Sequence, residues 1–390
     1  MEPIYRAKEF AAKALRRSRP YWEEAMGYAV EKVREDIPQF EGGYPGPASI
    51  NLMYPKIPNN AWTCSFWTGM LYLAYEHTMD KLFLDTASKT LPDWEHRLDA
   101  RVKTANHDLG FLYILSAKAD WMLTGNPEGR RIALKAADML MERYLPQAHI
   151  LQAWGEIGKD PENDGRIIID CLMNLPLLFW ASQETGDIRY RNAALHHLEA
   201  SRHLVRGDDT SFHTYYFDEE GKPLRGRTHQ GYSDDSCWAR GQAWGIYGFC
   251  LNYRYTRDMS LLVLAKRLAN HFLNRLPDDL VPYWDLVFVK GDDQERDSSA
   301  AAIAACGLFL LSSLLPVLDP DRQVYENAAL AMLGELNDRY STRGLKSNGI
   351  LMHATQAKPQ GKGIDECNIY GDYFFMDALD VLLHRHPLVW

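Results

Sequence analysis

The sequence predicts an all-α fold, an (α/α)6 barrel in which six helical hairpins form a ring, with short β-hairpins in its loops. One kind of unit recurs along the 390 residues. An apolar helix, a short polar turn and an amphipathic helix follow one another at intervals of about 40 to 70 residues. The apolar helix lacks a polar face and must be buried on all sides. The amphipathic helix has a single apolar stripe, which must pack against another part of the protein. Inner helices ringed by outer helices satisfy both requirements.

The units follow one another in order along the chain. The apolar helices are predicted at residues 66–76, 110–123, 174–182, 241–247, 300–315 and 371–383. Amphipathic helices follow the first five, at residues 81–91, 130–144, 189–202, 261–276 and 324–340. The sixth apolar helix has no such follower. An amphipathic segment near residues 6–33 is predicted to supply the missing outer helix and to close the ring.

No convincing linker or low-complexity tract interrupts the units, so residues 1–390 are predicted to form one closed domain. Two segments depart from the helical period, residues 211–217 and 281–285, and are rich in aromatic and β-branched residues. Such segments are typical of strands. We expect them to form short hairpins in the loops.

The net charge and the aromatic content of the chain limit the classes of function that it can have. The formal net charge is -9, which argues against general nucleic-acid binding. The one basic run, residues 13–19, is interpreted as a solvated helix face. The chain is unusually rich in aromatic residues, with 11 Trp, 21 Tyr and 14 Phe. Most aromatic residues belong to cores, but Trp beside Gly and polar residues also stacks on sugar rings.

Cysteine usage and apolar runs indicate the compartment. The six cysteines form no C-x-x-C pair and lie mostly in apolar stretches, which is typical of reduced packing residues: Cys64, Cys171, Cys237, Cys250, Cys306 and Cys367. No stretch has the apolar length of a signal peptide or of a membrane span. We therefore expect a cytoplasmic protein that needs neither a membrane nor an obligate protein partner.

Asp170 is the most unusual polar residue of the chain. It lies between Ile169 and an almost unbroken apolar run that begins at Cys171. A carboxyl in apolar surroundings keeps its proton to higher pH than a free one, which suits an aspartate to act as a general acid. The alternative is an N-cap of the helix that begins at Cys171, because Asp is a common N-cap residue.

The polar residues that precede the inner helices should meet at one end of the barrel, because all inner helices run the same way. They comprise residues 60–62, 106–108, 166–170, 238–240, 296–297 and 370–372. Helix capping explains several of the aspartates, and Asp297 and Asp372 are interpreted as caps or structural partners. Capping does not explain Trp62, His107, Trp238, Arg240 or Trp244.

These side chains indicate acid and base chemistry on a sugar. Two carboxyl groups among aromatic rings suit a glycosidase, and a guanidinium binds a carboxylate through two parallel hydrogen bonds. Metal catalysis is not predicted, because His196 and His197 are adjacent on an outer helix and cannot share a ligand face. The sequence has no G-x-S-x-G nucleophile elbow and no Gly-rich phosphate loop after a strand.

Several motifs, in the same order and over nearly the whole chain, closely resemble the unsaturated glucuronyl hydrolases of glycoside hydrolase family 88. The motifs are Trp62-Thr63 with residues 66–69, residues 107–113, 152–155 and 166–172, His213-Thr214 with residues 216–218, residues 229–231, and Trp238 with residues 240–248. The joint pattern is specific, whereas a shared toroid alone would not be.

The resemblance implies an unusual reaction on lyase products of glycosaminoglycans, which carry a 4,5-unsaturated uronic acid at the non-reducing end. The vinyl ether is hydrated. Asp170 would protonate C4 and assist the attack of water at C5, and Asp108 would hold substrate hydroxyls and tune Asp170. No cofactor is expected. By the same resemblance, the substrate-binding residues would be Trp62, His107, His213, Gln230, Trp238, Arg240, Trp244 and Lys362, with Arg240 recognising the carboxylate.

One departure concerns sulfate. Family members that favour sulfated disaccharides present serines and a lysine from a loop that corresponds here to residues 357–363. Lys362 is present but the serines are not, which puts a strong sulfate preference in doubt, although Lys358 or Gln360 would be able to substitute.

Three alternative functions stay open. The first is an unsaturated rhamnogalacturonyl hydrolase, which would act by similar chemistry on a product of pectin. The second is a sugar epimerase on the same toroid, which would rely on catalytic histidines. The third is a sugar-binding toroid without activity, which would keep the tryptophans and tolerate loss of Asp170.

Overall fold

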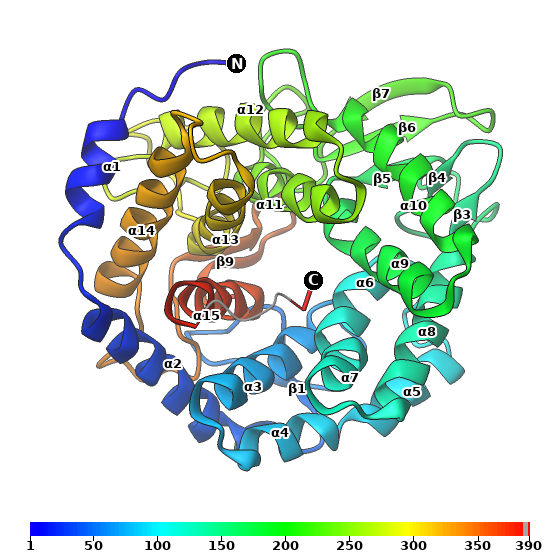
Figure 1. The fold of residues 1–390 in the computed structure, drawn as a ribbon, viewed down its shortest axis with the longest axis horizontal. Coiled ribbons are helices and arrows are strands. Elements are labelled where there is room, and N and C mark those ends of the chain that lie inside the picture. The colour runs from blue at the N-terminus through cyan, green and yellow to red at the C-terminus, as the bar shows by residue number, and fades with distance from the viewer. Residues whose placement is uncertain (385–388) are drawn as a thin grey trace.

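The computed structural model describes residues 1–384 and 389–390. Figure 1 shows an inner ring of helices surrounded by an outer ring, which confirms the predicted (α/α)6 barrel. Each inner helix packs on the next around the ring. The inner helices are α3 (Cys64–Thr78), the continuous rod of α6 (Leu109–Tyr113), η1 (Ile114–Lys118) and α7 (Ala119–Thr124), α9 (Cys171–Thr185), α11 (Ala239–Thr256), α13 (Ser298–Leu314) and α15 (Ile369–Leu383).

The outer ring covers these helices in sequence order. It consists of α4 (Lys81–Ser88), α5 (Leu91–Asp99), α8 (Pro127–Met141), α10 (Ile188–Ser201), α12 (Met259–Arg275) and α14 (Arg322–Arg339). The predicted N-terminal helix is in fact two helices, α1 (Ala7–Ala14) and α2 (Arg19–Phe40). Pro20 at the start of α2 lacks the backbone N–H that a continuous helix would need. α2 packs on α15 as expected, whereas α1 packs on α14.

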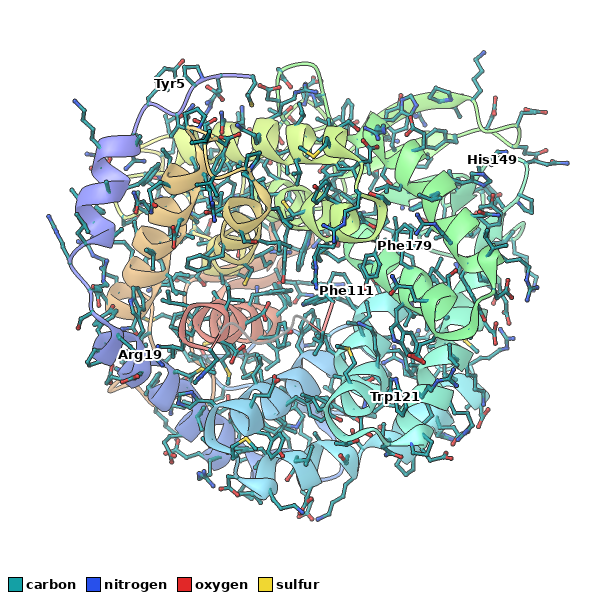
Figure 2. The ribbon with its side chains drawn as sticks, in the orientation of Figure 1. Tyr5, Arg19, Phe111, Trp121, His149 and Phe179 are labelled. Atoms are coloured by element: carbon teal, nitrogen blue, oxygen red, sulfur yellow. The ribbon has the colours of Figure 1, made fainter. Side chains whose placement is uncertain are left out.

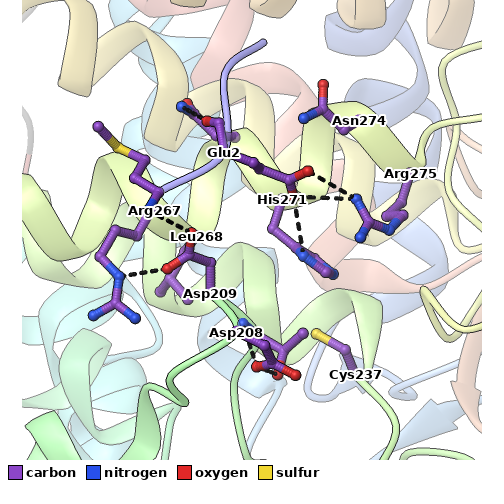
Figure 3. Close-up of polar contacts among 12 residues, drawn as sticks. Glu2, Asp208, Asp209, Cys237, Arg267, Leu268, His271, Asn274 and Arg275 are labelled. Atoms are coloured by element: carbon purple, nitrogen blue, oxygen red, sulfur yellow. Dashed lines mark hydrogen bonds and ion pairs between the residues drawn. The ribbon is translucent and has the colours of Figure 1, made fainter. Parts of the chain in front are cut away.

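The segment before α1 is bound along α12 by polar contacts (Figure 3). The Glu2 carboxylate lies 3.2 Å from Nδ1 of His271 and 3.1 Å from Arg275, both on α12. Nearby, Arg267 of α12 pairs with Asp209 at 2.5 Å. These contacts hold the beginning of the chain against the outer ring.

A repeated polar turn joins four of the hairpins. A threonine hydroxyl bonds back to its own helix, a residue in the left-handed region follows, and an Asp or Asn then caps the outer helix. The four turns are residues 78–80, 124–126, 185–187 and 256–258. At the last of them, Asp258 accepts a hydrogen bond from the backbone N–H of Ser260 at 2.9 Å. Such caps end one helix and start the next within three residues.

Glycine allows neighbouring inner helices to approach closely. A Cβ atom on Gly110 of α6 would lie 2.3 Å from the Cα of Asn174 on α9, which is too close for any side chain. Comparable contacts of 3.0 Å or less recur at four more pairs around the ring: Gly69 on Tyr373, Gly248 on Leu172, Gly307 on Tyr247 and Gly371 on Ser299. The barrel is therefore held at small helix separations.

The second inner helix departs from the regular α form. Residues Ile114–Lys118 form a π-helical turn. Lys118 at its end is buried and donates a hydrogen bond to the backbone carbonyl of Val389, and burial lowers the pKa of this lysine to about 7. Trp390 is also buried and lies edge-on to Phe111 at 5.7 Å.

Short strands occupy the loops, as predicted, but not all at the predicted places. β1 (Tyr44–Pro45) pairs with β2 (Lys56–Ile57), β3 (Tyr144–Leu145) with β4 (Ile150–Leu151), and β8 (Ala354–Ala357) with β9 (Lys362–Glu366). β6 (Thr214–Phe217) lies between β7 (Pro223–Arg227) and β5 (Arg166–Ile168) in a three-stranded sheet.

Residues 281–285, which we expected to form a hairpin, make only isolated bridges. Tyr283 pairs with Arg296 and Asp285 with Trp238. The expectation of a hairpin is therefore wrong here. Instead, the side chain of Asp285 accepts hydrogen bonds from the backbone N–H groups of Tyr232 and Cys237, which ties the segment to the loop before α11.

Two predictions from sequence concern the cysteines, expected to be reduced packing residues, and the apolar segments, expected to be too short to span a membrane. All six cysteines are buried free thiols, as the sequence indicated. Within residues 1–384 and 389–390, we find no helix with the length and apolar content of a membrane span.

The contact at Gly110 predicts a large effect of one methyl group. Gly110→Ala should destabilise the protein by roughly 2 kcal/mol or more, because the added atom meets the backbone of α9 and not a movable side chain. Gly27→Ala is the matched control, since Gly27 lies inside α2 with open space around its Cα and should gain about 0.5 kcal/mol in helix propensity. Urea denaturation measures both. Equal stability of the two variants would contradict the close packing.

Candidate active site

Asp170 lies where β5 passes into α9, at the N-cap position of that helix. Its side chain nevertheless makes no capping hydrogen bond. Its Oδ1 atom is buried and has no hydrogen-bond partner among the residues that the structure describes. The interpretation of the Asp170 side chain as a helix cap is therefore wrong.

Asp108 is the second acid, and it precedes α6 as Asp170 precedes α9. Only 8% of its surface is exposed, and its side chain makes no capping hydrogen bond either. Burial, with a smaller contribution from the charge of Asp170, raises the pKa of Asp108 to about 8. Burial also raises the pKa of Asp170 to about 7, against the opposing positive charge of Arg240. Both acids thus exchange protons near neutral pH.

Asn174 links the two helices that carry these acids. Its Nδ2 donates to the backbone carbonyl of Asp170 at 3.1 Å, and its Oδ1 accepts from the backbone N–H of Phe111 at 2.8 Å. Asn174 is 1% exposed in an otherwise apolar helix. From sequence, Asn174 was predicted only to begin an inner helix, although a buried amide in an apolar run indicates a structural hydrogen bond.

His213 is held as a neutral hydrogen-bond donor. Its Nδ1 accepts from the backbone N–H groups of His229 at 3.0 Å and Gln230 at 3.1 Å, which places the ring proton on Nε2. This Nε2 is buried, and no described residue accepts from it. Burial holds the pKa of His213 well below its usual value. The ring is therefore able to donate to a ligand near neutral pH without carrying charge.

His107 lies beside the acids. Its Nε2 is 3.4 Å from Oδ1 of Asp108, and burial lowers its pKa to about 3. Its backbone N–H donates to Ala153, so the chain before α6 is tied to the segment that follows β4. The imidazole thus stays neutral next to Asp108.

Arg240 forms a buried ion pair. It donates to Oδ2 of Asp297 at 2.6 Å, to the carbonyl of Thr355 at 2.7 Å and to the carbonyl of Gln356. Asp297 also caps α13 by accepting from the backbone N–H of Ser299 at 3.1 Å, as the sequence indicated. The guanidinium is thus committed to protein oxygens through both terminal nitrogens.

Asp372, the other aspartate interpreted as structural, has three protein partners. It accepts from the hydroxyl of Tyr54 at 2.8 Å and from the backbone N–H groups of Ile350 at 3.0 Å and Leu351 at 2.8 Å. Both oxygens of its carboxyl group are engaged by these bonds, which supports the structural interpretation.

The three tryptophans singled out by sequence lie at different depths. Trp238 packs on His213 with 4.4 Å between ring centroids, and the guanidinium of Arg240 lies over it at 4.5 Å. Trp62 is half-buried and stacks on Tyr370 at 5.3 Å. Trp244 is fully buried, against Phe111 at 5.3 Å. Trp62 and Trp238 therefore lie around the acids. Trp244 lies deeper inside the barrel, against Phe111, which is labelled in Figure 2.

Gln230 and the β8–β9 hairpin bound the same region. Gln230 donates through Nε2 to the carbonyl of Gln356 at 2.9 Å, which fastens the loop of residues 228–231 to β8. Lys362 at the start of β9 is exposed. Burial lowers the pKa of His229, with smaller contributions from the positive charges of Arg166 and Lys362. All the site residues predicted from sequence except Trp244 are thus gathered around the starts of the inner helices.

Two further residues complete this surface and were not assigned from sequence. Trp154 lies edge-on to His229 at 5.1 Å, and Arg166 of β5 lies over the Trp154 ring at 5.2 Å. Both stand in the motifs that carry the resemblance, so the signal was present. Their pairing across two loops was not visible in the sequence.

The arrangement suits proton transfer. Two acids titrate near neutral pH beside neutral imidazoles, and aromatic rings surround them. In the part of the chain that the structure describes, no group of three or more His, Cys, Asp and Glu side chains is placed to hold a metal ion.

The sequence of this chain is similar to one protein family and to characterised members of it. The sequence model of glycosyl hydrolase family 88 matches residues 51–315. An unsaturated chondroitin disaccharide hydrolase from Streptococcus pyogenes serotype M1 is 46% identical over 382 residues, which cover 97% of this chain and 95% of the relative.

Two solved structures are close over the whole chain. The crystal structure of unsaturated glucuronyl hydrolase from Streptococcus agalactiae has a TM-score of 0.96 at 43% identity and covers 100% of this chain and 98% of its own. A variant from the same species, complexed with dGlcA-GalNAc6S, has a TM-score of 0.88 at 41% identity with the same coverage.

The raised pKa of Asp108 predicts that this acid destabilises the fold at high pH. Because its folded-state pKa lies above the unfolded value of about 4, ionisation penalises the folded state increasingly as pH rises towards 8. Asp108→Asn should therefore stabilise the protein by on the order of 5 kcal/mol at pH 8.5, at about 1.4 kcal/mol for each pKa unit, and have little effect near pH 4. Urea denaturation at both pH values measures this difference.

Asp297→Asn serves as the contrasting variant. It leaves the buried guanidinium of Arg240 without its carboxylate and should destabilise the protein by roughly 3 kcal/mol. A loss of stability in Asp108→Asn that is equal at both pH values would show that Asp108 is a structural partner.

Proposed function

The chain belongs to glycosyl hydrolase family 88, and on that premise we propose that it is an unsaturated glucuronyl hydrolase of glycosaminoglycan breakdown. It releases the 4,5-unsaturated uronic acid from the non-reducing end of lyase-generated oligosaccharides. The observation that carries the proposal is the buried, unpartnered Oδ1 of Asp170, whose pKa of about 7 suits proton donation at neutral pH.

The reaction is a hydration. Asp170 gives its proton to C4 of the vinyl ether, which leaves positive charge on C5 and the ring oxygen. A water molecule attacks C5, and its proton returns to the Asp170 carboxylate, so that the acid is regenerated. The product is a hemiketal that opens and releases the remaining sugar. One group with a pKa near 7 is suited to both transfers, because neither protonation state is strongly favoured.

The surrounding side chains would bind the substrate. Asp108, which is mostly protonated at neutral pH, is suited to hold hydroxyl groups and to limit negative charge beside Asp170. The free Nε2–H of His213 supplies a donor, and Trp62 and Trp238 supply faces for the sugar ring.

Arg240 is assigned a modified role. Its terminal nitrogens are engaged by Asp297 and two carbonyls, so the bidentate grip expected from sequence would have to replace protein contacts. We propose that Arg240 attracts the uronate carboxylate through its charge and fixes the position of Trp238, which lies against it.

The substrate is proposed to be a chondroitin-type disaccharide. The support is the 46% identity with an unsaturated chondroitin disaccharide hydrolase and the similarity to a variant that was complexed with dGlcA-GalNAc6S. These names also favour this reaction over the rhamnogalacturonyl, epimerase and inactive alternatives.

The residue proposed to meet a sulfate group is Lys362. Lys358 is bound to Glu295 and lies over Trp284, and Gln360 donates to the carbonyl of His229 at 2.7 Å. Lys358 and Gln360, which were considered from sequence as replacements for the missing serines, are therefore both engaged in contacts within the protein. Lys362, which is exposed, is the cation of this loop that remains available.

The whole chain is proposed to act as one catalytic domain of residues 1–390. The support is that α1 and α2 complete the outer ring on α14 and α15. The six buried thiols favour a reducing compartment, and we place the enzyme in the cytoplasm on that ground.

Asp170→Asn should abolish the loss of ultraviolet absorbance that accompanies turnover of an unsaturated chondroitin disaccharide. The amide occupies the same space but has no proton to give, so kcat should fall by at least about 10³-fold while substrate binding persists. Stopped-flow absorbance and calorimetric titration measure the two effects. Reaction of the wild-type protein in labelled water should place the label at C5. A near-normal rate in the variant would show that the acid is misassigned.

Lys362→Gln should reduce kcat/KM for a sulfated disaccharide about tenfold, because a charge-assisted hydrogen bond is lost. The unsulfated disaccharide should change less than about twofold. Lys8→Gln is the matched control, since it removes the same charge from exposed α1. Steady-state assays on both substrates supply the ratio. Equal losses on the two substrates would rule out a sulfate contact.

A further inference from the structure

Two histidines and a tyrosine converge on the outer surface of the ring, where the β3–β4 hairpin meets α10. Tyr144 belongs to β3, His149 precedes β4 in the same hairpin, and His196 lies on α10. Figure 2 shows His149 at the periphery of the molecule, on the hairpin beside α10. His149 and His196 are exposed and Tyr144 is half-buried, so this cluster is open to solvent. The proposed reaction uses none of the three residues.

The nitrogen and oxygen atoms of the cluster face one another. Nδ1 of His149 lies 2.9 Å from Nδ1 of His196, and the Tyr144 hydroxyl lies 2.5 Å from His196 Nδ1 and 3.5 Å from His149 Nδ1. A triangle of these sides has a circumscribed radius of about 1.8 Å. A point about 2.0 to 2.1 Å from all three atoms therefore exists just above it, and this is the bond length of zinc to imidazole.

The local backbone holds His149 in this position. Its φ is +57°, in the left-handed region that few residues other than Gly adopt and in which Asn, Asp and His are enriched. The hairpin is also bonded to α10 beneath the cluster, because the backbone N–H of Leu151 donates to Nδ1 of buried His197 at 2.8 Å. The hairpin that carries Tyr144 and His149 is thus joined to α10, which carries His196, without a metal ion.

The ligand types favour particular metal ions. Neutral imidazole is a preferred ligand of zinc and copper, whereas calcium and magnesium prefer oxygen. The hydroxyl of Tyr144 is a weaker contact, and water would fill the remaining positions.

We propose that His149 and His196, with Tyr144 as a third contact, bind one Zn²⁺ or Cu²⁺ ion on the outer surface and thereby clamp the β3–β4 hairpin to α10. The sequence analysis considered only His196 with its neighbour His197. The fold separates those two to different faces and brings in His149, which lies 47 residues away.

Titration of the full chain with ZnCl2 tests the proposal, after removal of any affinity tag and treatment with a chelator. One ion should bind per chain. His196→Gln and His149→Asn should each weaken binding at least tenfold, and Asn tolerates the left-handed backbone at that position. His96→Gln is the control, because His96 is an exposed histidine of α5 outside the cluster, and it should bind as the wild type does.

Two further measurements separate a metal site from a hydrogen-bonded cluster. Bound Cu²⁺ should show hyperfine splitting from two imidazole nitrogens, reduced to one in either variant. Zn²⁺ at about 100 times Kd should raise the Tm of the wild type by roughly 3 °C and leave His196→Gln unchanged. Failure to bind either ion, or binding that both variants retain, would overturn the proposal. All variants should keep wild-type activity, which confirms that they fold.

Discussion

Neighbouring inner helices meet so closely that hydrogen is the only side chain that fits at several of their contacts. At Gly110 a single extra carbon would lie 2.3 Å from the backbone of Asn174. Because the contacts recur around the ring, each helix fixes the distance and the rotation of the next. Dense packing of this kind transmits small displacements instead of absorbing them. The position of every loop at the ends of the helices therefore depends on these glycines.

The two acids depend on this packing most directly. Asp108 and Asp170 precede α6 and α9, which touch at Gly110 and are joined by the side chain of Asn174. The contact brings the carboxyl groups together and excludes the water that would otherwise stabilise their charge. The raised pKa values of Asp108 and Asp170 thus follow from the burial that helix packing produces. The same burial that weakens the fold at high pH gives the acids their reactivity.

Sequence reasoning succeeded where the signal is local and repeated. The apolar and amphipathic helices and their polar turns follow from periodicity and capping, and Asp170 was conspicuous within its apolar run. It failed where distant residues meet. The pairing of Arg240 with Asp297 spans 57 residues, and the sequence offers each of them several alternative partners. The π-helical turn at Ile114–Lys118 and the break between α1 and α2 also depend on tertiary contacts or on a single proline.

The closure of the ring has a consequence for how the protein is made. α2 packs on α15, yet more than three hundred residues separate them in the chain. At a translation rate of about 5 to 20 residues per second, α2 leaves the ribosome on the order of tens of seconds before its partner exists. Throughout that interval α15 is not available to cover the apolar stripe of α2, whereas α3, the next inner helix, already is. The barrel is thus completed only after α15 has been synthesised, when the last inner helix meets α2.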